Sequence, residues 1–389
     1  MSTTERISLE AGLVRLMTLI SPLSRREQVP LSAAPGRVLA QPVITRLDAP
    51  PFSRSPLDGY ALRAADTAGA TPERPIRLAL GGQAVPVSTG SPIPAGLDCV
   101  VKVEDTQREG DTVILTAPLS PWQNYIFQGE DMRAGVPLFS AGTRLDWTCI
   151  GALAVQGIET LPVFARPRVG VLSTGGELSP MGKPLPTGSI HDANGPLLAA
   201  RLNALGMEPI LFPPTEDNAA AIARQINAAF TKAACDFLLT TGGVSVGTED
   251  ALPHAAELLG ATVLFHGLAV RPGSPAMAFS VERHPVLALS GNPFAALAVF
   301  EAVGRPALDA LAGCSCSDSR RVSLRLGGGL PASSVRRLIR AFSAGETVTP
   351  AAGGHSSGQI YSLSGCNCLI DRLPGPTLPP GAPVSVLSL

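Results

Sequence analysis

The sequence predicts a multidomain α/β protein built around a parallel sheet with helices on both faces (an αβα arrangement) and flanked by β-rich regions. Three observations favour this class. The chain has 389 residues, which is too many for a single core. Between residues 166 and 312, apolar β-branched runs alternate with helical stretches rich in Ala and Leu. The 40 Gly and 37 Pro are spread between apolar runs, so they separate many short elements.

The composition argues against several classes of protein. Hydrophobic residues make up 45% of the chain and charged residues 16%, which argues against global disorder. The 30 Lys and Arg balance 31 Asp and Glu, so the basic excess of a general nucleic-acid binder is missing. Aromatic residues amount to only 4%, a value that does not indicate a base-stacking platform.

The N-terminus and the cysteines indicate a cytoplasmic protein. The first six residues include an acid and lack the apolar core of a signal peptide. The most apolar later stretch, 285–303, is broken by Ser-Gly-Asn-Pro at 290–293, so no clean membrane-spanning segment remains. Seven cysteines without an export signal fit reduced thiols.

The first predicted elements are a helix and a β region. Residues 8–20 should form a helix capped by Ser8, because five apolar residues of this stretch fall on one face. From about 36 to 145, short β-like runs such as 99–103 and 112–115 are broken by Gly and Pro, which predicts an all-β domain. A second helix is expected from 147 to 157.

The following region predicts βαβ units and a parallel sheet covered on both faces. The expected strands and helices are 169–172, 209–212, 237–240, 261–265 and 286–289, and 196–205, 218–229 and 293–308. From 313 to 389 the chain returns to short strands, which predicts a small β-barrel or sandwich.

The loops after the predicted strands carry the candidate site, because ligands of an open parallel sheet bind at the carboxyl ends of its strands. Four loops qualify, namely 173–177, 214–217, 241–250 and 290–293. All except 214–217 contain glycines, whose backbone N–H groups can approach phosphate oxygens. In the last loop, Asn292 is a candidate cap for the next helix and Pro293 occupies its first turn.

Three carboxylates at neighbouring strand ends, Glu177, Asp217 and Asp250, could hold a Mg²⁺ ion, which prefers oxygen ligands. Together the loops predict a site for a phosphorylated ligand and a divalent metal. Any one of these loops alone would be interpreted as an ordinary strand-to-helix turn, and their repetition on one sheet favours a site. Asp217 also fits a helix cap.

The β region adds three motifs, at 55–61, 89–94 and 129–131. Taken alone, each is typical of a turn with a solvated side chain. With the sheet loops, however, they resemble the molybdopterin molybdotransferase family, which includes bacterial MoeA proteins and the matching domain of gephyrin. The family's D-G-Y-A, T-G-x-P-x-P, G-E-D and A-G-T-x-L correspond to 58–61, 89–94, 129–131 and 141–145. Its S-T-G-D-E-L, G-x-I-x-D-x-N, S-G-G-V-S-V-G with a trailing acid, and G-N-P correspond to 173–178, 188–194, 241–250 and 291–293. So many ordered matches are improbable by chance.

The resemblance implies four domains and a homodimer. Residues 1–45 and 141–165 would form an elongated linker region, 46–140 a β domain, 166–312 the αβ molybdopterin-binding domain and 313–389 a C-terminal β-barrel. The active site would be a cleft between the αβ domain of one subunit and the β domain of the other.

The resemblance also implies a Mg²⁺-dependent transferase that uses adenylylated molybdopterin and molybdate and releases AMP with the molybdenum cofactor, for use by molybdenum enzymes. The implied catalytic residues are Asp58, Asp131, Glu177, Asp250 and Arg271. The implied metal ligands are Glu177, Asp217 and Asp250. The implied cofactor-binding residues are Thr89, Ser173, Thr174, Gly175, Thr241, Gly242, Gly243, Ser245, Ser274, Ser290, Gly291, Asn292 and Pro293.

Three departures from the family pattern leave alternatives open. Gly176 replaces an Asp, Arg271 and Ser274 replace two lysines, and Tyr-Ile-Phe-Gln at 125–128 replaces a basic run. A catalytically weakened paralogue that binds pterin or acts as a scaffold is one alternative. An enzyme that adenylylates molybdopterin is another, which the extra β domain disfavours.

Other candidate residues favour structural roles. The cysteine pairs 314/316 and 366/368 are too closely spaced for a typical zinc site, so we interpret them as core or strand-edge thiols. His191 lies at an unspecified position of its motif and is given no chemical role. No Walker A loop or G-x-G-x-x-G opens a helix, which argues against a P-loop NTPase or a dinucleotide oxidoreductase.

Overall fold

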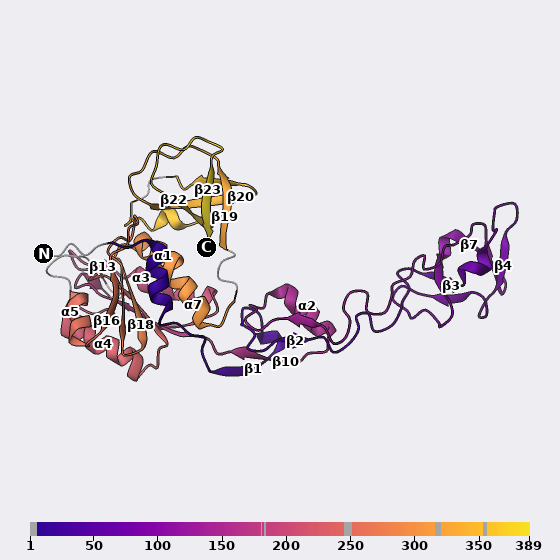
Figure 1. The fold of residues 1–389 in the computed structure, drawn as a ribbon, viewed down its shortest axis with the longest axis horizontal. Coiled ribbons are helices and arrows are strands. Elements are labelled where there is room, and N and C mark those ends of the chain that lie inside the picture. The colour runs from indigo at the N-terminus through magenta and orange to yellow at the C-terminus, as the bar shows by residue number, and fades with distance from the viewer. Residues whose placement is uncertain (1–5, 180, 183, 245–250, 316–319, 353–355) are drawn as a thin grey trace. The chain divides into compact units, whose positions relative to one another are not determined.

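The computed structural model describes residues 6–179, 181–182, 184–244, 251–315, 320–352 and 356–389. The chain divides into two compact units (Figure 1). Unit 1 comprises Met1–Gln41, Ala141–Asp146 and Thr160–Leu389, and unit 2 comprises Pro42–Ser140 and Trp147–Glu159. The boundaries of the four domains named above stay a prediction.

Unit 1 is built on a six-stranded sheet in the order β14-β11-β15-β18-β17-β16. Its strands are β11 (Arg168–Ser173), β14 (Glu208–Leu211), β15 (Phe237–Thr241), β16 (Thr262–His266), β17 (Met277–Val281) and β18 (His284–Leu289). Strands β14, β11, β15 and β18 are parallel, as the sequence predicts. The predicted strand at 261–265 is present as β16 and runs in the same direction as these four, but the prediction missed β17, which is antiparallel to both β16 and β18. Only Glu282 and Arg283 separate β17 from β18, and a two-residue turn can join antiparallel strands only.

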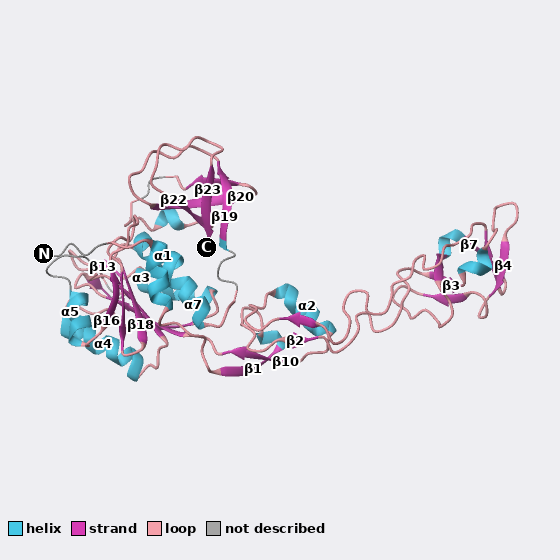
Figure 2. Cartoon of the chain, in the orientation of Figure 1, coloured by secondary structure: helices cyan, strands magenta, loops and turns pink. Residues whose placement is uncertain are grey.

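Helices cover both faces of this sheet, as predicted (Figure 2). They are α1 (Leu9–Met17), α3 (Asn194–Ala204), α4 (Ala219–Thr231), α5 (Ala251–Leu258), α6 (Pro293–Val299) and α7 (Arg305–Leu311). Strand β15 shows the two faces, because Phe237 and Leu239 pack with α1, α3, α6 and α7, whereas Leu238 packs with α4 and α5. The helix expected at 293–308 is divided by a π-helical turn, Phe300–Gly304.

Predicted helix starts are confirmed at two positions. The Ser8 hydroxyl accepts a hydrogen bond from the Ala11 N–H at 3.1 Å, and the Asn218 side chain accepts one from the Ala221 N–H at 2.9 Å. Helix α1 ends at Met17, three residues before the expected end.

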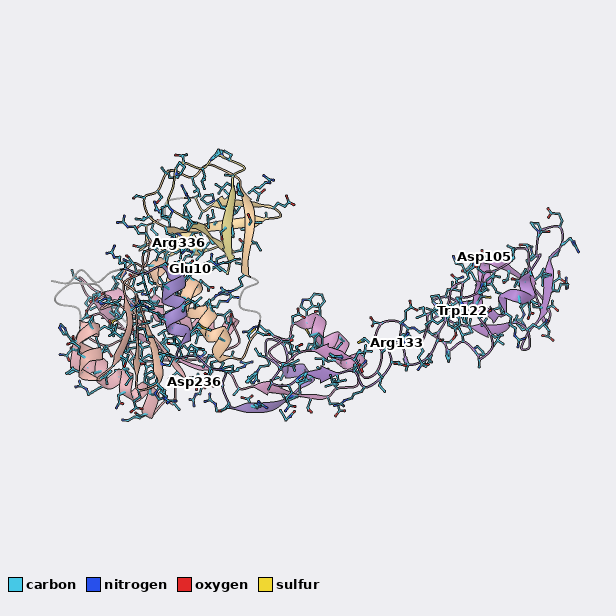
Figure 3. All side chains as sticks on the ribbon, in the orientation of Figure 1. Glu10, Asp105, Trp122, Arg133, Asp236 and Arg336 are labelled. Carbon is cyan, nitrogen blue, oxygen red and sulfur yellow. The ribbon has the colours of Figure 1, made fainter. Side chains whose placement is uncertain are left out.

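The last part of unit 1 is a closed barrel with strand order β19-β21-β20-β22-β23, so the alternative of a sandwich is wrong. The strands are β19 (Arg321–Leu326), β20 (Arg337–Ala344), β21 (Thr347–Pro350), β22 (Cys368–Arg372) and β23 (Pro383–Ser388). The barrel packs on the sheet layer through Leu338, Leu369 and Leu387, which belong to the same apolar cluster as α1. The Arg336 guanidinium also donates to Glu10 of α1 (Figure 3).

Strand β1 (Arg26–Pro30), which precedes unit 2 in the chain, pairs antiparallel with β10 (Thr160–Phe164), which follows unit 2 in the chain. Both strands belong to unit 1. Short 3₁₀ turns occur in both units at Leu31–Ala33, Ala64–Thr67, Val103–Asp105 and Tyr361–Leu363.

Unit 2 is mostly β structure, as predicted. One sheet has the order β5-β3-β6, with β3 (Gly59–Leu62), β5 (Val85–Val87) and β6 (Cys99–Lys102). A second has the order β4-β8-β7, with β4 (Ile76–Ala79), β7 (Thr106–Glu109) and β8 (Thr112–Leu115). A strand pair, β2 (Val43–Ile44) with β9 (Pro137–Phe139), and helix α2 (Trp147–Val155) complete it. In the described part of either unit, no helix has the length and apolarity needed to cross a membrane.

Candidate active site

A pocket of about 480 Å³ opens at the carboxyl ends of β11, β15 and β18, where the sequence predicts the site. All of its lining residues belong to unit 1. The predicted residues that line it are Thr174, Glu177, Asp217, Thr241, Gly242, Gly243, Ser290, Gly291, Asn292 and Pro293. Four loops that are far apart in sequence therefore meet at one edge of the sheet.

The backbone at the centre of the pocket requires glycine. Gly242 has φ +92°, and its N–H donates to the Leu289 carbonyl at 3.1 Å. A Cβ atom at Gly242 would lie 2.2 Å from the carbonyl oxygen of Thr174. Gly243 has φ +58°, and a Cβ atom added there would lie 3.1 Å from the Thr174 hydroxyl and 3.5 Å from the Asp217 carboxylate. The loop after β15 therefore packs directly on the loop after β11.

Two predicted binding residues lie behind this surface. The buried Ser173 hydroxyl accepts a hydrogen bond from the Thr241 hydroxyl at 3.3 Å. The N–H of Gly175 donates to the Thr215 carbonyl at 3.0 Å, which joins the loop after β11 to the loop after β14. Ser173 and Gly175 are not among the lining residues, so in this structure they support the loops.

The start of α6 forms another wall. Pro293 occupies the first turn, as predicted, but the Asn292 side chain makes no capping hydrogen bond. Instead the Asn292 N–H donates to the Ser290 hydroxyl at 3.2 Å, so the serine side chain orders this loop.

Two residues that line the pocket carry no role in the sequence analysis, although the 188–194 motif contains both. The Asp192 carboxylate accepts hydrogen bonds from the N–H groups of Asn194 and Gly195, at 3.0 and 3.1 Å, and so caps α3. The Asn194 side chain donates to the Gly291 carbonyl at 2.7 Å. Its buried Oδ1 atom has no partner in the described structure and can accept a hydrogen bond from a ligand.

The pocket collects carboxylates at its rim. Glu177 and Asp217 are exposed, and Asp192 is partly exposed. Among the described residues, no three acid, histidine or cysteine side chains are grouped closely enough to hold a metal ion. The third predicted ligand, Asp250, and the predicted binding residue Ser245 lie outside the described residues.

Two predicted residues that replace family lysines do not line the pocket, although Pro275 beside them does. The Arg271 backbone is hydrogen-bonded to the barrel, because its N–H donates to Arg336 and its carbonyl accepts from Leu338, both at 2.9 Å. The Ser274 hydroxyl donates to the Leu268 carbonyl at 2.9 Å. In this structure, therefore, the contacts given above for Arg271 and Ser274 hold the chain together and do not face the pocket.

The barrel contributes a wall that the sequence analysis missed. Gly358 lines the pocket, and the neighbouring Ser357 carbonyl accepts from the N–H of Phe294 in α6 at 3.1 Å. The Arg340 guanidinium stacks over the Phe294 ring at 4.2 Å and donates to the carbonyl of Gln359 at 2.6 Å. Strand β20 thus holds both this barrel segment and the start of α6.

In unit 2, the predicted residues Asp58 and Thr89 lie together. Asp58 Oδ1 accepts from the Thr89 N–H at 2.7 Å and from its hydroxyl at 3.2 Å, and both residues are exposed. Asp131 is exposed as well, and its N–H donates to the Ala49 carbonyl at 3.0 Å.

The loop that carries Asp131 is braced by Asp48. The Asp48 carboxylate accepts from the Ala134 N–H at 2.9 Å and from the Gln128 amide at 2.8 Å. These hydrogen bonds lower the pKa of Asp48 below its ordinary value.

Described cysteine thiols do not line the pocket. Burial raises the pKa of Cys99 to about 12 and that of Cys235 to about 11, so both are protonated at neutral pH. Cys316 lies outside the described residues, so the predicted interpretation of the 314/316 pair stays a prediction.

Glycine loops, hydroxyls and carboxylates at the carboxyl edge of a parallel sheet define an α/β protein whose pocket lies where such folds bind small molecules. Comparison with known proteins is more specific. The family model "MoeA N-terminal region (domain I and II)" matches residues 7–157, and "Probable molybdopterin binding domain" matches residues 170–310.

Curated relatives and a solved structure agree with these matches. A molybdopterin molybdenumtransferase from Synechococcus elongatus is 37% identical over 72% of this chain and 74% of its own length. One from Staphylococcus aureus is 32% identical over 89% of this chain and 87% of its own. The crystal structure of the molybdopterin biosynthesis moeA protein from Pyrococcus horikoshii OT3 is similar with a TM-score of 0.84 and 28% identity, covering 99% of this chain and all of that one. The chain therefore belongs to the MoeA family of molybdopterin molybdenumtransferases.

Proposed function

We propose that this chain inserts molybdate into adenylylated molybdopterin, with Mg²⁺ as cofactor, and releases AMP together with the molybdenum cofactor. The observation that carries the proposal is the unit 1 pocket at the carboxyl edge of the sheet. Its lining combines glycines that a side chain could not replace, such as Gly242, with the carboxylates of Glu177 and Asp217. The family assignment supports the class of reaction. We further propose that the protein works in the cytoplasm and supplies the cofactor to molybdenum enzymes.

The pterin and its phosphate would be held by the unit 1 pocket. The Thr174 and Thr241 side chains and the Gly242–Gly243 backbone offer hydrogen-bonding groups at its centre. The unpaired Asn194 Oδ1 can accept a hydrogen bond from a ring N–H of the pterin. No protein nucleophile is required, because the dithiolene sulfurs of the substrate form the bonds to molybdenum.

The donor set fits a hard divalent cation. Glu177 and Asp217 both present carboxylate oxygens to the pocket, and neither side chain makes a hydrogen bond or ion pair in the described structure that would compete with a metal. Mg²⁺ bound there would neutralise charge on the phosphoanhydride oxygens as AMP departs. Glu177 and Asp217 would hold the Mg²⁺ ion within the pocket, and Asp250 is the proposed third ligand of the ion.

We also propose a homodimer in which Asp58, Thr89 and Asp131 of unit 2 complete the site of the other subunit. Support comes from their exposure and from the Asp58–Thr89 hydrogen bonds, which fix an exposed carboxylate without burying it. Such a carboxylate is available to a ligand from outside its own domain.

The experiment is a turnover assay on the purified full-length chain. Incubation with adenylylated molybdopterin, molybdate and Mg²⁺ should release AMP and yield molybdenum-loaded cofactor. Binding of the substrate without AMP release would overturn the proposal.

A weakened paralogue is a second candidate, because Arg271 and Ser274 do not line the pocket. In that case Gly176→Asp combined with Ser274→Lys should create turnover that the unaltered chain lacks. A Cβ at Gly176 meets no atom within 4 Å, so Asp fits there. Turnover by the unaltered chain would exclude this candidate.

A further inference from the structure

An imidazole side chain holds the wall of the unit 1 pocket just beyond its two glycines. His266, the last residue of β16, has its Nε2 atom 3.2 Å from the backbone carbonyl oxygen of Val244. A carbonyl oxygen only accepts hydrogen bonds, so Nε2 carries the hydrogen and donates it. Val244 lines the pocket and directly follows Gly242 and Gly243, whereas His266 is not one of the lining residues. His266 therefore contacts the wall and not the pocket itself.

The hydrogen bonds described for the two glycines come from backbone atoms. The Gly242 N–H donates to the Leu289 carbonyl at 3.1 Å, and the Gly243 carbonyl accepts from the Leu252 N–H at 3.3 Å. Such bonds form with any side chain at the partner position, provided that the fold is kept. The bond to Val244 differs, because it requires a side-chain donor of the right length. This part of the wall therefore depends on the identity of one residue that is distant in sequence.

The Val244 side chain explains why its carbonyl needs a partner. Val244 is 3% exposed and packs with Leu252 and Met277 in the apolar cluster on the face of the sheet that α4 and α5 cover. In a residue this buried, water is a poor substitute for a lost partner, and an unpaired backbone carbonyl is unfavourable. Loss of the imidazole should therefore favour other conformations of the wall.

A β-bulge in β16 changes the direction in which its last side chains point. In the pairing of β16 with β17, Val263 lies opposite Phe279. Phe265, two residues later, lies opposite Ala278, which is the next residue of β17, so Leu264 is an extra residue. An extra residue reverses the alternation of side chains between the two faces of a sheet.

This reversal places His266 on the face that holds Val244. His266 lies opposite Met277, which shares an apolar cluster with Val244, and directly opposite residues of antiparallel strands point to the same face. With regular alternation from the start of β16, His266 would point to the face that α1 covers. The carbonyl of the extra residue, Leu264, accepts a hydrogen bond from the Arg15 guanidinium of α1 at 2.9 Å. The bulge is therefore a supported feature that directs the imidazole to the pocket wall.

We propose that His266 is a positioning residue for the proposed molybdopterin site, and that it acts by holding the Val244 carbonyl and so fixing the conformation of the wall formed by residues 242–244. This inference rests on the proposed function, which places the pterin and its phosphate in this pocket. Gly242 and Gly243 have φ +92° and +58°, and glycine can adopt many other conformations, so a bond at the next residue restricts the wall to one of them. Bulges occur often next to active sites, where they direct a side chain.

Three substitutions of His266 in the full-length protein test this role, with the Kd for molybdopterin measured by calorimetry. His266→Gln places an amide nitrogen near the position of Nε2 and should bind like the wild type. His266→Asn is too short to reach Val244, and His266→Phe keeps a ring but has no donor. Both should raise the Kd roughly fivefold, because a hydrogen bond of ordinary strength is lost.

His284→Ala is the control for a loss of stability without a change at the pocket. His284 begins β18, at the opposite edge of the sheet, and its ring stacks on Phe230 with the centroids 4.6 Å apart. The substitution should lower Tm and leave the Kd unchanged. Thermal unfolding of each variant is measured in parallel, and if His266→Phe does not fold, the comparison of His266→Gln with His266→Asn still decides.

Three results would overturn the inference. His266→Asn and the folded His266→Phe could bind molybdopterin like the wild type. His266→Gln could bind as weakly as His266→Asn, which would mean that the ring matters and the hydrogen bond does not. His284→Ala could weaken binding as much as His266→Asn, which would mean that affinity simply follows stability.

The turnover assay separates this inference from the proposed function. If the variants bind molybdopterin in the expected order but the wild type releases no AMP from adenylylated molybdopterin, the positioning role stands and the proposed function fails. If the wild type turns over and all the variants bind equally well, the proposed function stands and the positioning role is wrong. A wild type that does not bind molybdopterin would contradict both.

Discussion

The side-chain amide of Asn194 donates a 2.7 Å hydrogen bond to the backbone carbonyl of Gly291. This bond joins the first residue of α3 to the loop after β18, and both residues line the pocket. Its other amide atom, Oδ1, is buried and has no partner in the described structure. One side chain therefore both holds the pocket together and offers an acceptor to a ligand.

Asn194→Ala should weaken molybdopterin binding by about tenfold or more, because the loss of a buried hydrogen-bonding group costs roughly 1–3 kcal/mol. Isothermal titration with molybdopterin measures the change. Asn203→Ala, an exposed position of the same helix, is the control and should bind like the wild type. Equal affinities for both variants would remove Asn194 from the site.

Gly242→Ala should lower the free energy of unfolding by about 2 kcal/mol or more and abolish turnover, because the new methyl group would meet the Thr174 carbonyl at 2.2 Å. Denaturant unfolding and the AMP-release assay check the two effects. Gly176→Ala, on the neighbouring loop, adds its methyl to open space and should leave stability unchanged. A Gly242→Ala protein as stable as Gly176→Ala would contradict the packing of these loops.

Gly358→Leu should raise KM several-fold without lowering Tm, because an exposed barrel residue lines the pocket and a larger side chain would narrow it. Gly358 does not have a positive φ, so the substitution introduces no backbone strain. Gly328→Leu is the matched control in the barrel, where an added Cβ atom meets nothing within 4 Å. If both variants had wild-type KM, the barrel would not form a wall of the working site.

Acid stability should depend on Asp371 of the barrel. Burial raises the pKa of this carboxyl, but hydrogen bonds and charge attraction from the guanidinium groups of Arg336 and Arg321 lower it by more than burial raises it. The pKa of Asp371 therefore lies below the ordinary value of 3.8. A lowered pKa in the folded state means that the stabilisation is present at neutral pH and is lost as the pH falls through that pKa. Asp371→Asn should cost about 1–3 kcal/mol at neutral pH, because it removes the buried carboxylate that pairs with Arg336 and Arg321, while Arg336 keeps Glu10 as a partner. Urea unfolding from pH 7 to pH 3 should show a gap between wild type and variant that narrows with acid, and a constant gap would be inconsistent with this assignment.

Much of the site could be predicted from the sequence because its loops follow buried apolar strands. The apolar runs that form β11, β15 and β18 are recognisable in the sequence. Thr174, Thr241 and Ser290 stand at the carboxyl ends of these strands, so their place at the edge of the sheet could be predicted. The antiparallel β17 was missed because the two-residue turn at Glu282 is not one of the usual glycine turns. Gly358 could not be found, because only the packing of the barrel brings it to the pocket. The stacking of Arg340 on Phe294 likewise depends on tertiary structure.

Mixed dimers of two inactive variants test the composite site most directly. Asp58→Asn alters unit 2 and Glu177→Gln alters unit 1, and each variant alone should release no AMP. If each site combines unit 1 of one subunit with unit 2 of the other, a dimer of the two variants has one intact site and should show about half the wild-type rate. Mixed dimers as inactive as their parents would contradict the account.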